Sequence, residues 1–65
     1  MKDGRKRSNI TIGTHVKVVK KQDQRTGELT EGVVQRILTN SSNHTHGIKV
    51  MLESGIVGRV KEIMD

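Results

Sequence analysis

A polar segment between two predicted strands carries the residues best suited to binding phosphate. Residues 20–27 read KKQDQRTG. Lys20, Lys21 and Arg25 can neutralise phosphates, and the Gln24 amide can recognise base edges or hydroxyls. A solvated hairpin loop would have the same composition, and the sequence leaves both interpretations open. The length of the segment in so small a chain favours a binding role.

A second polar segment lies further along the chain, at 40–46, and reads NSSNHTH. Asn40, Ser41, His44 and His46 offer amide, hydroxyl and imidazole groups for contacts with a polar ligand. Ordinary turn chemistry, in which the Asn and Ser side chains bond their own backbone, is the alternative. In a small barrel we expect the two segments to lie on one face.

The histidines and serines do not form a convincing metal or catalytic site. His44 and His46 have the spacing to share a metal ion with His15, but no acidic cluster lies near them in the sequence. Ser41 or Ser42 with His44 supplies the residue types of a nucleophile and base, without a nucleophile elbow or an oxyanion signature. The sequence therefore predicts no metal, no cofactor and no enzymatic activity.

Composition restricts the remaining possibilities. The chain has 65 residues, enough for one domain, and its lack of cysteine excludes disulfides and thiol chemistry. It also has no Phe, Tyr or Trp, which removes the aromatic platforms that bind unpaired bases and favours structured RNA recognised by shape. There is neither a membrane-length apolar run nor a signal-peptide pattern, so we expect a cytoplasmic location and no membrane partner.

The net charge of +5 is unevenly distributed along the chain. Residues 1–9 hold four basic and one acidic side chain, for +3, and the remaining eight basic and six acidic residues give +2. We expect a disordered basic arm at 1–9, either a solvated tail or a phosphate-binding segment, followed by one domain at 10–65.

Hydrophobic periodicity predicts the elements that must position these groups. Alternating apolar residues predict strands at 14–20, 31–38, 48–52 and 56–63, with a short strand at 10–12 and a possible bend or bulge at Gly58. The expected fold is all-β: a small five-stranded SH3-like barrel with a flexible basic N-terminal arm. The predicted core comprises Ile10, Ile12, Val16, Val18, Val33, Ile37, Ile48, Val50, Leu52, Ile56, Val60 and Ile63.

Several ordered motifs resemble a known family. They are KQDQRTG at 21–27, GVV at 32–34, ILTNSS at 37–42, HTHGIKV at 44–50 and GIVGRV at 55–60. Together they resemble the YwbE family of small bacterial and archaeal proteins over nearly the whole chain after the arm. This resemblance implies no particular activity. The layout is also similar to KOW-type and other SH3-like barrels of ribosomal and transcription proteins, which implies contact with RNA through a basic strand and loop.

The sequence-based hypothesis is a binding module for structured RNA or a ribonucleoprotein. Phosphate contacts are assigned to Lys20, Lys21, Gln24, Arg25 and the basic arm, and polar contacts to Asn40, Ser41, His44 and His46. Arg59 on the last strand, with Lys61 and Lys17, would extend the basic face unless neighbouring glutamates balance it. The alternative is a protein-interaction adaptor that uses the same loops or a strand edge. A metal-binding loop built on the histidines is a third hypothesis.

Overall fold

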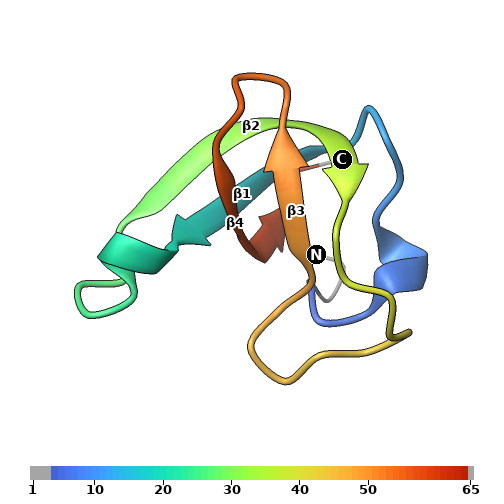
Figure 1. The fold of residues 1–65 in the computed structure, drawn as a ribbon, viewed down its shortest axis with the longest axis horizontal. Helices are drawn as coiled ribbons and strands as arrows, with labels where there is room; N and C mark the ends of the chain where they lie inside the picture. Colours follow the sequence, from blue (N-terminus) through green and yellow to red (C-terminus); the bar gives the residue numbers. More distant parts are fainter. Residues whose placement is uncertain (1–3, 65) are drawn as a thin grey trace.

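Four antiparallel strands form a closed barrel in the computed structural model, which describes residues 4–64 (Figure 1). Each strand pairs with the next along the chain, and the last returns to the first. The elements are the 3-10 turn η1 (Arg7–Asn9), β1 (His15–Lys20), the 3-10 turn η2 (Lys21–Asp23), β2 (Leu29–Ile37), β3 (Lys49–Leu52) and β4 (Val57–Ile63). The expected fold class, an all-β small barrel, is confirmed.

Two register shifts bend the strands, which allows this short sheet to close into a barrel. On β4, Lys17 faces Glu62 and Val18 faces Val60, so Lys61 is the extra residue of a bulge. On β2, Val34 faces Leu52 while Arg36 faces Met51. The β4 bulge lies three residues beyond Gly58, where the sequence suggested a bend.

Gly58 instead permits close packing of β4 on β1. A Cβ atom at this position would lie 2.8 Å from Val18 Cγ2 and 2.8 Å from the Val19 carbonyl oxygen. A side chain there would force the two strands apart, because the carbonyl belongs to the paired backbone.

Apolar side chains from all four strands fill the barrel. Its fully buried residues are Val16, Val18, Val34, Ile48, Val50, Leu52, Val60 and Ile63, joined by the nearly buried Ile10. Ile37 and Ile56 pack against this cluster and are partly buried. On β2 the core assignment of Val33 was out of phase, because Val34 is buried and Val33 only half-buried.

The predicted short strand at 10–12 is wrong, and so is the core assignment of Ile12. The Thr14 backbone N–H donates to the Thr11 carbonyl at 3.1 Å, and the hydroxyls of Thr11 and Thr14 lie 2.8 Å apart. Gly13, with φ +96°, completes this turn. The turn points Ile12 away from the barrel and leaves it 71% exposed.

The described part of the expected arm is paired with the second polar segment. Residues 1–3 lie outside the described residues, but Gly4 is buried and Lys6 forms an isolated antiparallel bridge with Asn43. Three backbone hydrogen bonds join Gly4, Arg5 and Arg7 to residues 42–48. Residues 4–9 thus differ from the expected disordered arm, because their backbone groups have partners in the domain.

Candidate nucleic-acid interface

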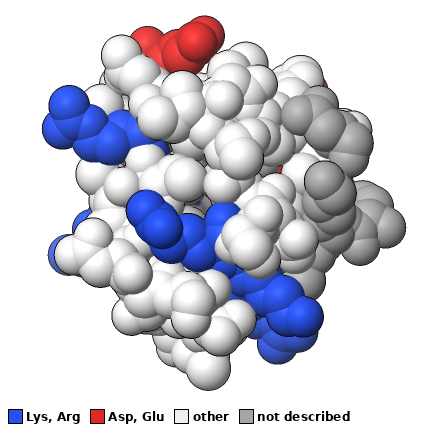
Figure 2. All heavy atoms as spheres, turned by 90° about the vertical axis from the view of Figure 1, so that its right-hand side faces the viewer, with Lys and Arg blue, Asp and Glu red and all other residues white. Residues whose placement is uncertain are grey.

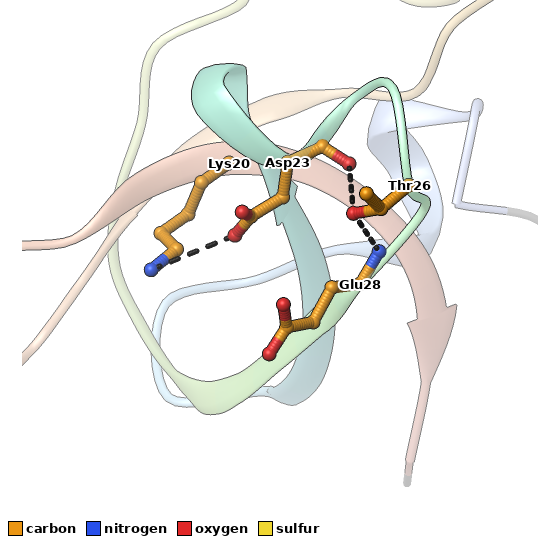
Figure 3. A network of polar contacts seen from close by, with 4 residues as sticks. All are labelled: Lys20, Asp23, Thr26 and Glu28. Atoms are coloured by element: carbon orange, nitrogen blue, oxygen red, sulfur yellow. Dashed lines mark hydrogen bonds and ion pairs between the residues drawn. The ribbon is translucent and has the colours of Figure 1, made fainter.

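The first polar segment folds into η2 and a tight turn that is closed by its own side chains (Figure 3). The Asp23 carbonyl accepts hydrogen bonds from the Gly27 N–H at 2.8 Å and from the Thr26 hydroxyl at 3.2 Å, while Thr26 Oγ1 accepts from the Glu28 N–H at 3.4 Å. Lys20 Nζ lies 3.6 Å from the Asp23 carboxylate. The Lys20 charge is therefore directed to Asp23, as the solvated-loop interpretation expects.

A basic groove adjoins this turn and crosses β4. It consists of two hollows that share Val19, Gln24 and Arg59, the larger enclosing about 680 Å³. Four cationic side chains line it, and none of its described lining residues is acidic. The full lining is Val19, Lys21, Gln24, Gly27, Leu29, His46, Lys49, Val57, Gly58, Arg59 and Lys61.

Strand register explains why the cations meet. Lys49 on β3 lies directly opposite Arg59 on β4, and both belong to the outward-facing alternation whose inward members are Val50 and Val60. Lys61, the extra residue of the β4 bulge, is exposed as well. Its ammonium group donates to the His46 carbonyl at 3.0 Å.

The second polar segment forms one wall of the groove. Besides the Lys61 contact, Arg59 Nη1 donates to the Gly47 carbonyl at 3.2 Å. The rings of His44 and His46 lie 5.8 Å apart, and His44 Nδ1 accepts the His46 backbone N–H at 3.2 Å. The backbone of His46 is thereby held at the groove by its N–H and its carbonyl.

The surroundings of His44 disfavour its charged form. Desolvation, followed by coulombic interactions with Arg59 and His46, lowers the pKa of His44 below its ordinary value of 6.5. His44 is therefore mainly neutral at pH 7 and can accept a hydrogen bond at Nδ1.

The structure brings together four of the predicted site residues, namely Lys21, Gln24, His46 and Arg59. The other five, Lys20, Arg25, Asn40, Ser41 and His44, are not among the groove-lining residues. The two polar segments do share one surface, since Gln24 and Gly27 of the first and His46 of the second line the larger hollow.

Sequence reasoning missed Lys49, and it considered Lys61 only as a possible extension of the basic face. The alternation of residues 48–52 already directs Lys49 outward, so this pattern was the available signal. Its proximity to Arg59 depends on how β3 pairs with β4, which the pattern of one strand does not specify.

Positive charge also occurs on the side of the molecule where η1 lies. Figure 2 shows Lys and Arg side chains distributed down this face, with the largest acidic surface at its upper edge. The N-terminal segment contributes the exposed residues Arg5, Lys6 and Arg7 to the described surface.

The third predicted histidine occupies a different environment. His15 Nε2 lies 2.7 Å from a Glu31 carboxylate oxygen across the β1–β2 pair. Within residues 4–64, no three His, Cys, Asp or Glu side chains are grouped so that they could hold a metal ion. No helix in this part of the chain has the length and apolar character needed to cross a membrane.

Comparisons with known proteins identify the family. The family model described as "Uncharacterized conserved protein (DUF2196)" matches residues 3–63. The chain is 50% identical over 62 residues to "Uncharacterized protein YwbE" of Bacillus subtilis (strain 168), covering 95% of each chain. No solved structure matches. These matches confirm the resemblance seen in the sequence motifs, and the chain belongs to the YwbE family of DUF2196 proteins.

Proposed function

We propose that this protein binds structured RNA through the basic groove, without catalysing a reaction. The observation that carries the proposal is the composition of the groove: four cationic side chains, one imidazole and no acid among its described lining residues. Such a surface attracts a polyanion and releases its counterions on binding.

The kind of nucleic acid follows from the groups that are present. The chain has no Phe, Tyr or Trp on which an unpaired base could stack. Lys21, Lys49, Arg59 and Lys61 can bind phosphates, and Gln24 can bond a 2′-hydroxyl or a base edge. Phosphate and hydroxyl contacts of this kind suit a folded RNA recognised through its backbone. We also propose that the protein is cytoplasmic and that its barrel belongs to the SH3-like class.

Binding without catalysis is supported by the same lining. The described residues of the groove include neither a carboxylate nor a hydroxyl. These are the groups that most often act together with a histidine in acid–base and nucleophilic catalysis.

A protein-interaction adaptor receives less support from the fold. In the closed barrel each of the four described strands pairs with a neighbour on both sides. Closure of the barrel therefore leaves less free sheet edge for addition of a partner strand. A protein partner in the groove remains an outcome that the test can identify.

The test is an amide chemical-shift titration of isotope-labelled protein with an RNA hairpin at two salt concentrations. We expect shifts at Lys21, Gln24, His46 and residues 57–61, and affinity that falls steeply with salt. No shifts at low salt would overturn the proposal. A salt-insensitive complex with a protein in place of RNA would favour the adaptor.

Matched charge variants locate the binding surface. Lys49→Gln removes one charge from the groove, and Arg36→Gln removes one from an exposed position on β2 that does not line it. We expect the first to weaken RNA binding more than the second. Equal losses would indicate attraction by net charge and contradict a site at the groove.

A further inference from the structure

We infer that residues 4–7, the N-terminal strap, hold the wall of the groove in its RNA-binding shape. This inference rests on the proposed function and assigns a positioning role to a segment outside the groove lining. The wall is residues 44–47, the end of the second polar segment together with Gly47, and it includes the lining residue His46.

Backbone hydrogen bonds join the strap to the wall and its flanks. The His44 N–H donates to the Arg5 carbonyl at 2.9 Å and the Ile48 N–H to the Gly4 carbonyl at 3.0 Å. The Arg7 N–H donates to the Ser42 carbonyl at 2.8 Å. These bonds lie on both sides of the wall, so the strap fixes its two ends.

Gly4 lies so close to Val60 that a side chain at position 4 would clash with it. A Cβ atom there would lie 2.7 Å from the Val60 carbonyl oxygen and 2.9 Å from Val60 Cγ1. Gly47 approaches the same carbonyl closely, with φ +102°. The strap and the wall therefore meet β4 at one backbone group, which cannot move aside without disturbing the barrel.

The wall is also bonded to two of the groove cations. Arg59 binds the Gly47 carbonyl at 3.2 Å and Lys61 binds the His46 carbonyl at 3.0 Å. The wall is thus bonded both to the strap and to two of the side chains proposed to bind phosphate. Release of the strap would let the wall move together with those two side chains.

The first experiment compares two variants that each add one methyl group and leave the charge unchanged. Gly4→Ala places it against the Val60 carbonyl, and Ser8→Thr places it at an exposed position just after the strap. For Gly4→Ala we expect amide exchange at His44 and Ile48 to quicken by about tenfold or more, as local opening becomes easier. RNA affinity should fall about threefold to tenfold, because a smaller fraction of molecules has the binding-competent wall. Ser8→Thr should change neither quantity.

Salt dependence separates positioning from charge. Gly4→Ala should leave the slope of affinity against salt unchanged, because all cations remain. Faster amide exchange with unchanged RNA affinity would overturn the positioning role. Unchanged amide exchange would overturn the claim that the strap holds the wall in place. Wild-type protein that binds no RNA would overturn the proposed function, whereas the exchange data would still decide whether the strap holds the wall.

A second pair of variants covers the case in which Gly4→Ala does not fold. Arg7 begins η1 and Lys6 is extended, with φ −104° and ψ 119°, so proline fits at position 7. Arg7→Pro removes the N–H that binds Ser42, and Arg7→Gln removes the same charge while keeping that N–H. Faster exchange at His44 and weaker binding in the proline variant alone support the inference, and identical behaviour of the two overturns it.

Discussion

The Arg59 guanidinium donates a hydrogen bond from Nη1 to the Gly47 carbonyl oxygen at 3.2 Å, which connects the β4 strand to the wall of the groove. Arg59 also lines both hollows. One side chain is therefore placed both to shape the groove and to attract phosphate.

We expect Arg59→Gln to weaken RNA binding and to reduce its salt dependence. Loss of one phosphate contact should lower the slope of log affinity against log salt by about 0.7 to 0.9. The measurement is a binding isotherm at several salt concentrations, with Arg36→Gln as the control. An unchanged slope in Arg59→Gln would show that Arg59 contacts no phosphate.

The pKa of His44 provides a probe of the same arrangement. Desolvation first, then coulombic interactions with Arg59 and His46, lower it below 6.5. The Arg59→Gln variant should therefore raise the pKa of His44 part of the way toward 6.5, which an NMR titration of the imidazole protons will measure. A His44 pKa that stays constant or falls in this variant would contradict the proximity of Arg59 to His44.

The same pKa shift has a defined sign for stability. Because the folded state favours neutral His44, its contribution to stability is present above about pH 6.5, the unfolded value, and decreases as the pH falls below it. Replacement of His44 by Gln should make stability less sensitive to pH in this range, measured by urea unfolding followed by circular dichroism. Equal pH dependence in the variant would contradict this assignment.

Removal of the Thr26 hydroxyl should loosen the turn beside the groove. Thr26→Val keeps the shape but loses the bonds to the Asp23 carbonyl and the Glu28 N–H (Figure 3). Because both bonds are exposed, we expect a loss of no more than about 1 kcal/mol in the free energy of unfolding. Amide exchange at Gly27 and Glu28 should quicken, whereas Thr45→Val in the other segment should leave these amides unchanged.

Two glycines of the sheet should tolerate alanine differently. At Gly58 the added methyl meets the Val19 carbonyl oxygen and Val18 Cγ2, each at 2.8 Å, whereas at Gly32 it meets Leu52 Cδ1 at 2.6 Å. A flexible side-chain end can move and a paired backbone carbonyl cannot. We expect Gly58→Ala to cost about 1–3 kcal/mol and Gly32→Ala less, measured by urea unfolding. The reverse order would show that β1 and β4 have room to separate.

The sequence alone was sufficient for the barrel class and for most of its core. The alternation of Val16 and Val18, and of Ile48, Val50 and Leu52, predicts which faces are buried, because side chains of a strand alternate between its faces. The ordered motifs were also sufficient to assign the family. Lys21, Gln24, His46 and Arg59 could be named as candidates because each is polar and lies in a loop or on an outward strand face.

Tertiary structure decided which candidates meet. Strand pairing places Lys49 beside Arg59, and the fold brings the His46 carbonyl to 3.0 Å from the Lys61 ammonium group; neither proximity is specified by local pattern. Ile12 has the apolar character of a core residue, but a threonine-bonded turn with Gly13 exposes it.

The N-terminal segment shows most clearly that local sequence does not specify long-range contacts. Its composition, rich in Lys and Arg, is typical of a solvated tail, since no local pattern satisfies its backbone groups. Residues 42–48, far away in the sequence, supply those hydrogen-bond partners, and the seat of Gly4 against Val60 exists only once β4 has joined the barrel. Local composition therefore determined what the segment could bind, and long-range backbone pairing decided where it lies.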